Sequence, residues 1–333
     1  MDREQEEMQF LGLLDIYIGS YKVLFSWRKL FSKITMALIL PLSFIFLAEI
    51  QISDLLFKDI IIDEIQLEET RAGSSNYQKL SSLVSTDWTY FWLFKLAFWT
   101  LYFILSLLST AAVVYTIACI YTSKEVSFRK VLSVVPKVWK RLMVTFLCIF
   151  FFLFLYNTAS FIVIFSWAFI VGPTNLGFGG IIVLLTIYLA GFVYLNVIWQ
   201  LATVVSVLED ACGVKAIVKS RALIKGKLWL VGAIFFMLNV AFGGIYLAFQ
   251  MLVVHGVSYG SLFRVCLGFI CLFLLSKFLL FALVIKTITY LVCKSYHHEN
   301  IDKSALSDHL EVYLGEYVPL TSKDVQLENY TYV

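Results

Sequence analysis

Four polar residues lie near the centres of long apolar blocks, where they could bind a solute inside a membrane: Asn157, Asn196, Asn239 and Lys277. A charge at the centre of a bilayer costs roughly 2.5–3.5 kcal/mol on insertion scales, so Lys277 needs a polar neighbour or water. Transporters place polar substrate sites at this depth, which makes the four residues a candidate midplane site. The alternative is that they form hydrogen bonds between helices and only hold the spans together.

A second set of charges, Glu49 and Lys95, could meet across two neighbouring blocks. Glu49 lies near the end of the first block, and Lys95 lies a few residues into the second block from the same side. Because the two side chains are then at similar depth, we expect them to form an ion pair. A structural role for this pair is favoured over a part in an ion pathway.

The histidines and cysteines show no spacing that would support a metal site, and no CxxC pattern occurs. His297 and His298 lie together among polar residues, which favours a solvated pair. The sequence has no Walker loop, HExxH or GxSxG pattern. We therefore expect no enzymatic activity, no cofactor and no metal. Only Cys212 and Cys293 lie near predicted cytosolic helix ends, where palmitoylation is chemically feasible.

Six apolar blocks must position these residues. Hydrophobic residues make up 60% of the 333 positions and charged residues only 15%, far from the composition of a soluble domain. A helix crosses a bilayer in about 20 residues. The sequence thus predicts an all-α integral membrane protein, with a membrane domain at 34–292 between a cytosolic N-terminus (1–33) and a cytosolic tail (293–333). The predicted spans are 34–52, 90–121, 142–172, 177–208, 228–254 and 262–292.

Positive charge is concentrated on one side of this predicted arrangement. The connections 123–141 and 209–227 are rich in Lys and Arg, and so is the segment before the first block. The connection 53–89 is acidic, and the turn 173–176 carries no charge. Basic loops remain in the cytosol. The pattern predicts six spans with both termini on the cytosolic side.

Three basic segments, 11–32, 127–141 and 209–227, have the amphipathic pattern of helices that lie in the membrane interface. Pro136 should bend the second of them or divide it into two turns. In the third segment, either Arg221 and Lys225 reach lipid phosphates or the helix packs on protein with its basic residues directed at a polar partner. The candidate lipid-headgroup contacts are Arg129, Lys130, Lys137, Lys140, Arg141, Lys215, Lys219 and Arg221.

The order of interfacial helix, span, outer loop and span occurs three times, over roughly 11–121, 123–208 and 210–292. Residue similarity between the three units is faint. An ancient threefold repeat and a coincidence of topology both remain open.

Several stretches resemble known families. The run from Trp199 to Asp210, followed by Gly213, Ser220-Arg221 and Gly226, is similar to a pattern in bacterial multi-span proteins. These include the membrane domain attached to some glycerophosphodiester phosphodiesterases. Over most of its length the chain resembles a plant family of uncharacterised six-span transmembrane proteins, through Leu40-Pro41-Leu42, Val134 to Leu142 and Tyr313 to Leu320. Both resemblances imply a polytopic helical architecture, and neither implies a catalytic motif.

Two functions fit these features. The basic amphipathic segments favour a non-enzymatic membrane protein that organises the bilayer or a membrane complex, with anionic lipid on the cytosolic face and other membrane proteins as partners. The alternative is a transporter or channel for a small or lipid-like solute, which would use the midplane residues. The sequence has no basic arm interleaved with exposed aromatic residues, so nothing in it indicates binding to nucleic acid.

Overall fold

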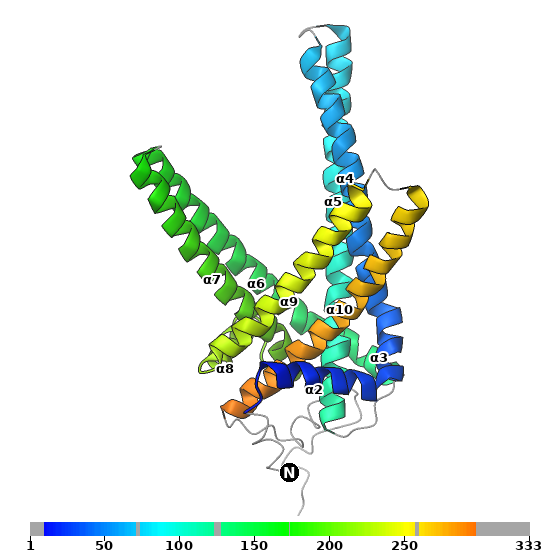
Figure 1. Ribbon diagram of the computed structural model, residues 1–333, viewed down its shortest axis with the longest axis vertical. Helices are drawn as coiled ribbons and strands as arrows, with labels where there is room; N and C mark the ends of the chain where they lie inside the picture. Colours follow the sequence, from blue (N-terminus) through cyan, green and yellow to red (C-terminus); the bar gives the residue numbers. More distant parts are fainter. Residues whose placement is uncertain (1–9, 71–73, 123–127, 173, 257–259, 298–333) are drawn as a thin grey trace, which may run out of the picture.

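The computed structural model describes residues 10–70, 74–122, 128–172, 174–256 and 260–297, and every regular element among them is a helix (Figure 1). The α-helices are α2 (Leu13–Ser26), α3 (Arg28–Ile34), α4 (Leu40–Glu69), α5 (Ser75–Tyr121), α6 (Phe128–Val171), α7 (Asn175–Leu208), α8 (Val214–Ile224), α9 (Leu228–Phe249) and α10 (Ser261–Tyr296). Two short π-helices, η1 (Thr35–Ile39) and η2 (Gln250–Val254), follow α3 and α9 without a break.

Six helical stretches of the described chain are long and apolar enough to cross a membrane. They are 28–69, 76–121, 138–171, 177–208, 228–254 and 261–296. This confirms the predicted all-α fold with six spans. Several stretches continue well past the predicted boundaries, most of all the first two.

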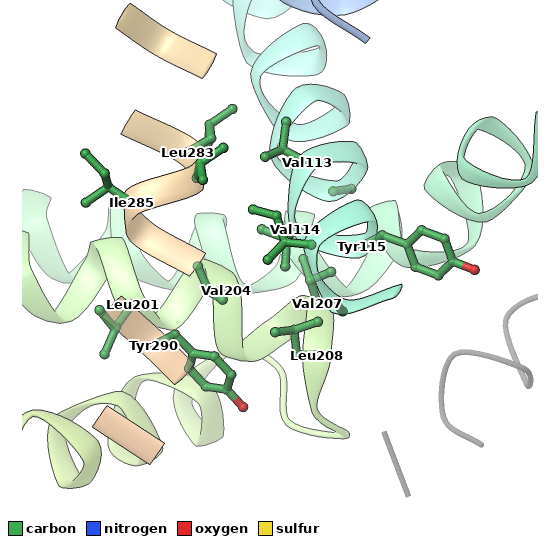
Figure 2. Packing of buried hydrophobic residues seen from close by; sticks show 14 of the residues in the cluster. Val113, Val114, Tyr115, Leu201, Val204, Val207, Leu208, Leu283, Ile285 and Tyr290 are labelled. Carbon is green, nitrogen blue, oxygen red and sulfur yellow. The ribbon is translucent and has the colours of Figure 1, made fainter. Parts of the chain in front are cut away.

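The ends of three spanning helices pack into one buried core, which we call the base. Val113 of α5, Leu201 of α7 and Ile285 of α10 are all fully buried in it. Figure 2 shows side chains from these three helices gathered in this core. Residues of α2, α3, η1, α8, α9 and the first part of α6 complete the same cluster. Apolar burial in the base therefore joins all the spans at one end.

Beyond the base the spans diverge, and the α6–α7 pair leaves on the opposite side from the α4–α5 pair (Figure 1). In its most apolar window only 6% of the α6 span is buried, and 11% of the α7 span, against 61% for α5. Phe161 and Ile187 are among the large apolar side chains that point outward there. A contiguous apolar surface of this size is expected to face lipid.

The α6–α7 pair is held together along its length by close approach at two glycines. A Cβ atom on Gly180 would lie 2.3 Å from the Trp167 ring, and one on Gly191 would lie 2.3 Å from the Tyr156 hydroxyl. That hydroxyl donates a hydrogen bond to the Tyr188 carbonyl at 2.8 Å, and the two tyrosine rings stack at 5.6 Å. Small residues thus allow two large aromatic groups to pack between the helices.

The connection 53–89, which the sequence analysis treated as a loop, is helical over almost its whole length. Helix α4 runs on to Glu69, and α5 begins at Ser75 after the Ser74 side chain caps its first turn. The resulting pair extends well past the tips of the other spans (Figure 1). Helix α5 has 47 residues and contains neither glycine nor proline.

Side chains inside this outer part of the α4–α5 pair explain why it is helical. Ile60 and Val84 are buried between the two helices, and Trp88 packs edge-on against Phe57 at 6.2 Å. The Trp88 indole also donates a hydrogen bond to Glu64 at 2.9 Å. Each helix therefore buries one side against the other in this outer part of the pair.

From Phe128 onward, the basic segment 127–141 is the first part of α6 and continues into the span through Pro136. Val134, Val138 and Leu142 are buried in the base, so protein covers most of the apolar face that was expected to lie in the membrane interface. This packing keeps the helix continuous even though Pro136 lacks a backbone N–H.

The segment 209–227 contains α8, which packs back along α7. The Ser220 hydroxyl donates to the Ile198 carbonyl at 2.8 Å, and Ala216 and Leu223 are buried. Helix α8 therefore packs on protein, while Arg221 and Lys225 remain exposed, so each of the two interpretations of this segment holds in part. The remaining basic segment forms α2, which lies across the base and contacts α10 (Figure 1).

Candidate functional site

The three asparagines of the candidate midplane site do not meet one another. Asn157 is exposed, and its side chain bonds to the Leu153 carbonyl of its own helix and to the Tyr188 hydroxyl, both at 2.8 Å. The Asn196 side chain accepts a bond from Gln200, one turn along the same helix. Asn157 thus links α6 to α7, while Asn196 stays within α7.

The remaining members are also separate. Asn239 donates to the Phe235 carbonyl of its own helix at 2.8 Å. Lys277 is exposed, and no hydrogen bond or ion pair joins it to another residue in the described part of the chain. The prediction of a polar midplane site built from these four residues is therefore wrong for the described structure.

Lys277 lies close to the point where α10 enters the base. The span predicted from the sequence, 262–292, has residue 277 at its centre. In the structure, α10 enters the base after Leu280, and Leu274 is the last large apolar side chain exposed before that point. Tyr17 of α2 packs against Phe281 at 5.9 Å. Lys277 therefore lies one helical turn from α2, near one end of the exposed part of α10.

Lys277 lines a cavity of about 610 Å³ between α2, α3, α9 and α10, which we call the α2–α10 cavity. Apolar side chains make up most of its wall. Its lining includes Phe25, Arg28, Ala241, Ile245, Leu274 and Lys277.

The predicted ion pair between Glu49 and Lys95 is present in the structure. Glu49 also accepts a hydrogen bond from Ser53 at 3.0 Å, and the Lys95 ammonium lies 5.5 Å from the centre of the Phe91 ring. These contacts tie α4 to α5, in agreement with the structural role that the sequence analysis favoured.

The most connected polar group lies where α7 ends, and we call it the Glu209 cluster. The Glu209 carboxylate accepts hydrogen bonds from Tyr290 at 2.6 Å and from Lys294 at 2.9 Å, and pairs with Lys219 at 2.6 Å. Arg141 donates to the Glu209 carbonyl at 2.7 Å. One residue at the end of a span thus connects α6, α7, α8 and α10.

The protonation state of Glu209 follows from these contacts. Burial alone would raise the pKa of its carboxyl. Hydrogen bonds from Lys219, Tyr290 and Lys294 outweigh burial and hold the pKa below its ordinary value of 4.5. The carboxylate is therefore charged at neutral pH, and it neutralises cations that would otherwise repel one another at the base.

Buried hydroxyls hold the chain reversal after α7. Ser206 donates to the Thr145 hydroxyl at 2.9 Å, and the Gly213 amide donates to the same oxygen at 2.8 Å. Gly213 has φ +60°, and a Cβ there would lie 3.3 Å from the Cys148 sulfur. Only glycine adopts this backbone comfortably in so tight a space, which allows α8 to begin against α6.

Among the side chains that the structure describes, the candidate headgroup contacts fall into two groups. Arg141 and Lys219 pair with Asp210 and Glu209, at 3.0 and 2.6 Å, so their assignment to lipid is corrected. The side chain of Lys137 lies outside the described residues. The others are exposed, and no hydrogen bond or ion pair engages them within the part of the chain that the structure describes: Arg129, Lys130, Lys140, Lys215 and Arg221.

Sequence reasoning missed Tyr290 and Lys294. The signal available was Glu209 itself, an acidic residue that directly follows an apolar stretch of more than 30 residues and precedes a basic segment. Its partners lie 81 and 85 residues further along the chain, so no local pattern identifies them. Cys293, one candidate for palmitoylation, is fully buried in the base, whereas Cys212 is exposed.

Comparison with known proteins gives a family. No curated protein and no solved structure matches the chain. One family model matches residues 1–330, which is nearly the entire sequence. The chain belongs to the family described as Domain of unknown function (DUF8558).

Proposed function

We propose that this chain is a non-enzymatic multi-pass membrane protein that organises lipid at the cytosolic face of its membrane, with both termini in the cytosol. The observation that carries the proposal is the two-sided character of α2. Ile16 and Ser20 are fully buried in the base. An outward stripe is apolar and 52–70% exposed, and consists of Leu14, Ile18, Tyr21 and Phe25.

A helix with this stripe would lie along the membrane surface. Its apolar side would enter the boundary between headgroups and acyl chains, while Lys22 and Lys29 remain exposed nearby. Packing of Ile16 against the base fixes the helix in this position, so the protein holds an apolar ridge at one depth. A rigid ridge in one leaflet orders the lipids around it.

The exposed cations support an anionic lipid partner. Each Lys or Arg near a membrane surface attracts anionic lipid by about 1 kcal/mol. Arg129, Lys130 and Lys140 extend from the start of α6, and Lys215 and Arg221 extend from α8. These groups lie at the same end of the molecule as α2, where the spans meet in the base (Figure 1).

Reconstituted vesicles test the proposal. A donor dye on the N-terminus and acceptor-labelled phosphatidylserine in phosphatidylcholine vesicles should give energy transfer above that for random mixing. Glutamine at the five exposed cations should remove the excess, because the attraction is electrostatic. Raising salt from 0.1 to 1 M shortens the screening length from about 10 to about 3 Å and should reduce the transfer as well.

The control replaces Lys58 and Lys79, which lie on the α4–α5 pair away from the base, and should keep the excess transfer. Equal transfer to labelled phosphatidylserine and phosphatidylcholine at every salt concentration would remove the basis for the proposal. A saturable solute flux across the same vesicles would instead favour the transporter alternative.

A further inference from the structure

The α2–α10 cavity has an unbalanced charge. Fourteen residues line it, two of them cations, Arg28 and Lys277, and none of them acidic. Lys277 has no hydrogen bond or ion pair with any other described residue, and the Arg28 guanidinium lies 5.7 Å from the centre of the Phe25 ring. An anion bound between the two cations would be attracted by both and would offset the repulsion between them.

A second cavity, which shares Arg28 with the first, adds to the positive charge in this region. Its volume is about 460 Å³, and its lining includes Arg28, Lys29 and Lys33 but no acidic residue. Phe128 from the start of α6 completes its wall. Arg28, at the junction of α2 and α3, therefore lines both the mostly apolar α2–α10 cavity and the second, basic cavity.

This arrangement matches the two parts of a membrane lipid. The α2–α10 cavity has a volume within the roughly 300–1,000 Å³ range of ligand sites. Its lining residues Phe25, Leu274 and Lys277 are themselves exposed, so the cavity opens toward the surroundings of the protein. A lipid would therefore need to insert only its phosphate region and part of one chain, and the remainder would stay in the bilayer.

We propose that the α2–α10 cavity binds one anionic phospholipid of the cytosolic leaflet, with its phosphate near Arg28 and Lys277 and one acyl chain along Ile245 and Leu274. Basic pockets between membrane helices on the cytosolic side are suited to anionic headgroups. The bound anion would offset the cost of keeping Lys277 charged beside lipid. The assignment rests on the proposed function in one respect, that α2 lies at the cytosolic surface.

Native mass spectrometry of the full chain tests this site. The detergent-purified protein is titrated with phosphatidylserine and, separately, with phosphatidylcholine. We expect one phosphatidylserine to bind ahead of all others. Lys277→Met and Arg28→Gln should each weaken this first binding by about fivefold, since each removes one cation near the phosphate. Lys79→Met removes an exposed cation of α5 outside the cavity and away from the base, and it should leave this first binding unchanged.

A second pair of variants tests the apolar part without changing any charge. Ala241→Trp places a large ring in the cavity and should abolish the first binding event. Val240→Trp, at the neighbouring exposed position of α9 outside the cavity, should not. Thermal unfolding of each variant shows whether it is folded, and both cation variants alter exposed side chains.

Three results would overturn the assignment. They are equal binding of phosphatidylcholine, an equal loss in Lys79→Met and Lys277→Met, and displacement of the lipid by soluble glycerophosphoserine, which has the headgroup but no chain. These outcomes are separate from the vesicle experiment, which depends on five other cations. The enrichment of anionic lipid at the surface can therefore persist when this single site is absent. Lipid binding at this site can likewise persist when the surface enrichment is absent.

Discussion

At the scale of single residues, Glu209 joins more elements than any other side chain discussed above. Glu209→Gln should destabilise the protein by about 3 kcal/mol, because it leaves Lys294 and Lys219 without their carboxylate in a largely buried setting. Unfolding by a denaturing detergent at pH 7 measures this change. Asp210→Asn, next to it but 82% exposed, should change stability by less than about 0.5 kcal/mol. Similar losses in the two variants would contradict the assigned role.

The same carboxyl predicts a pH dependence. Its pKa is lower in the folded protein than its ordinary value of 4.5, so the folded state favours the charged form. The stability it contributes is present above pH 4.5 and is lost as pH falls through the lower pKa of the folded state. The difference in stability between wild type and Glu209→Gln should thus be constant from pH 7 to 5.5 and shrink below 4.5. A difference that grows on acidification would show that the sign is wrong.

Whether the contacts of these residues could be predicted depended on how far apart the partners lie along the chain. Glu49 and Lys95 belong to consecutive helices, so equal depth was enough to pair them. Lys277 does not meet the asparagines, because hydropathy identifies an apolar stretch without showing which part of it packs on protein. Tyr290 and Glu209 come together only through packing of the base, and no periodicity in the sequence encodes that contact.

At the scale of elements, the α6–α7 pair offers a matched comparison of adjacent glycines. Gly180→Ala would drive a methyl group into the Trp167 ring and should destabilise the pair by about 1–3 kcal/mol. A Cβ atom on Gly179 would have no neighbouring atom within 4 Å, so Gly179→Ala should be neutral or slightly stabilising. Hydrogen exchange of the amides near the turn between α6 and α7 gives a local measurement. Equal exchange in both variants would mean that close approach at Gly180 is unimportant.

Element boundaries were harder to predict than element types. Acidic and polar residues in 53–89 suggested a loop, but Ile60 and Val84 recur on the inner sides of two helices that shield each other from water. In 127–141 the amphipathic pattern was correctly recognised as helical, but protein rather than lipid covers Val134 and Val138. A pattern of apolar residues identifies the covered side of a helix and does not identify what covers it.

At the scale of the whole molecule, the charge asymmetry predicts its orientation. An epitope inserted after Thr70, at the tip of the α4–α5 pair, should be protected from protease added to the cytosolic side of sealed membranes. A cysteine at Lys215, on exposed α8, should react with a membrane-impermeant reagent from the cytosolic side. Protection of both sites, or exposure of both, would refute the six-span orientation.

The six spans and the helical class were predictable because apolar length alone determines them. The divergence of the spans was not predictable from the sequence, since it depends on which helix ends pack in the base and which helix surfaces face lipid. Three helical pairs, α4–α5, α6–α7 and α9–α10, follow the order on which the repeat hypothesis was based (Figure 1). Whether they descend from one ancestral unit stays a prediction.

Helix α5 gives this molecule a mechanical property. Its 47 residues, at a rise of 1.5 Å each, form a rod about 70 Å long, more than twice the thickness of a hydrocarbon core. Without glycine or proline the rod has no natural hinge, and α4 braces its outer part through Trp88 and Glu64. One end is fixed among the fully buried residues of the base, and the other extends past the tips of the remaining spans. The α4–α5 pair is therefore a lever: a rotation of about 10° at the base would move its far tip by about 12 Å.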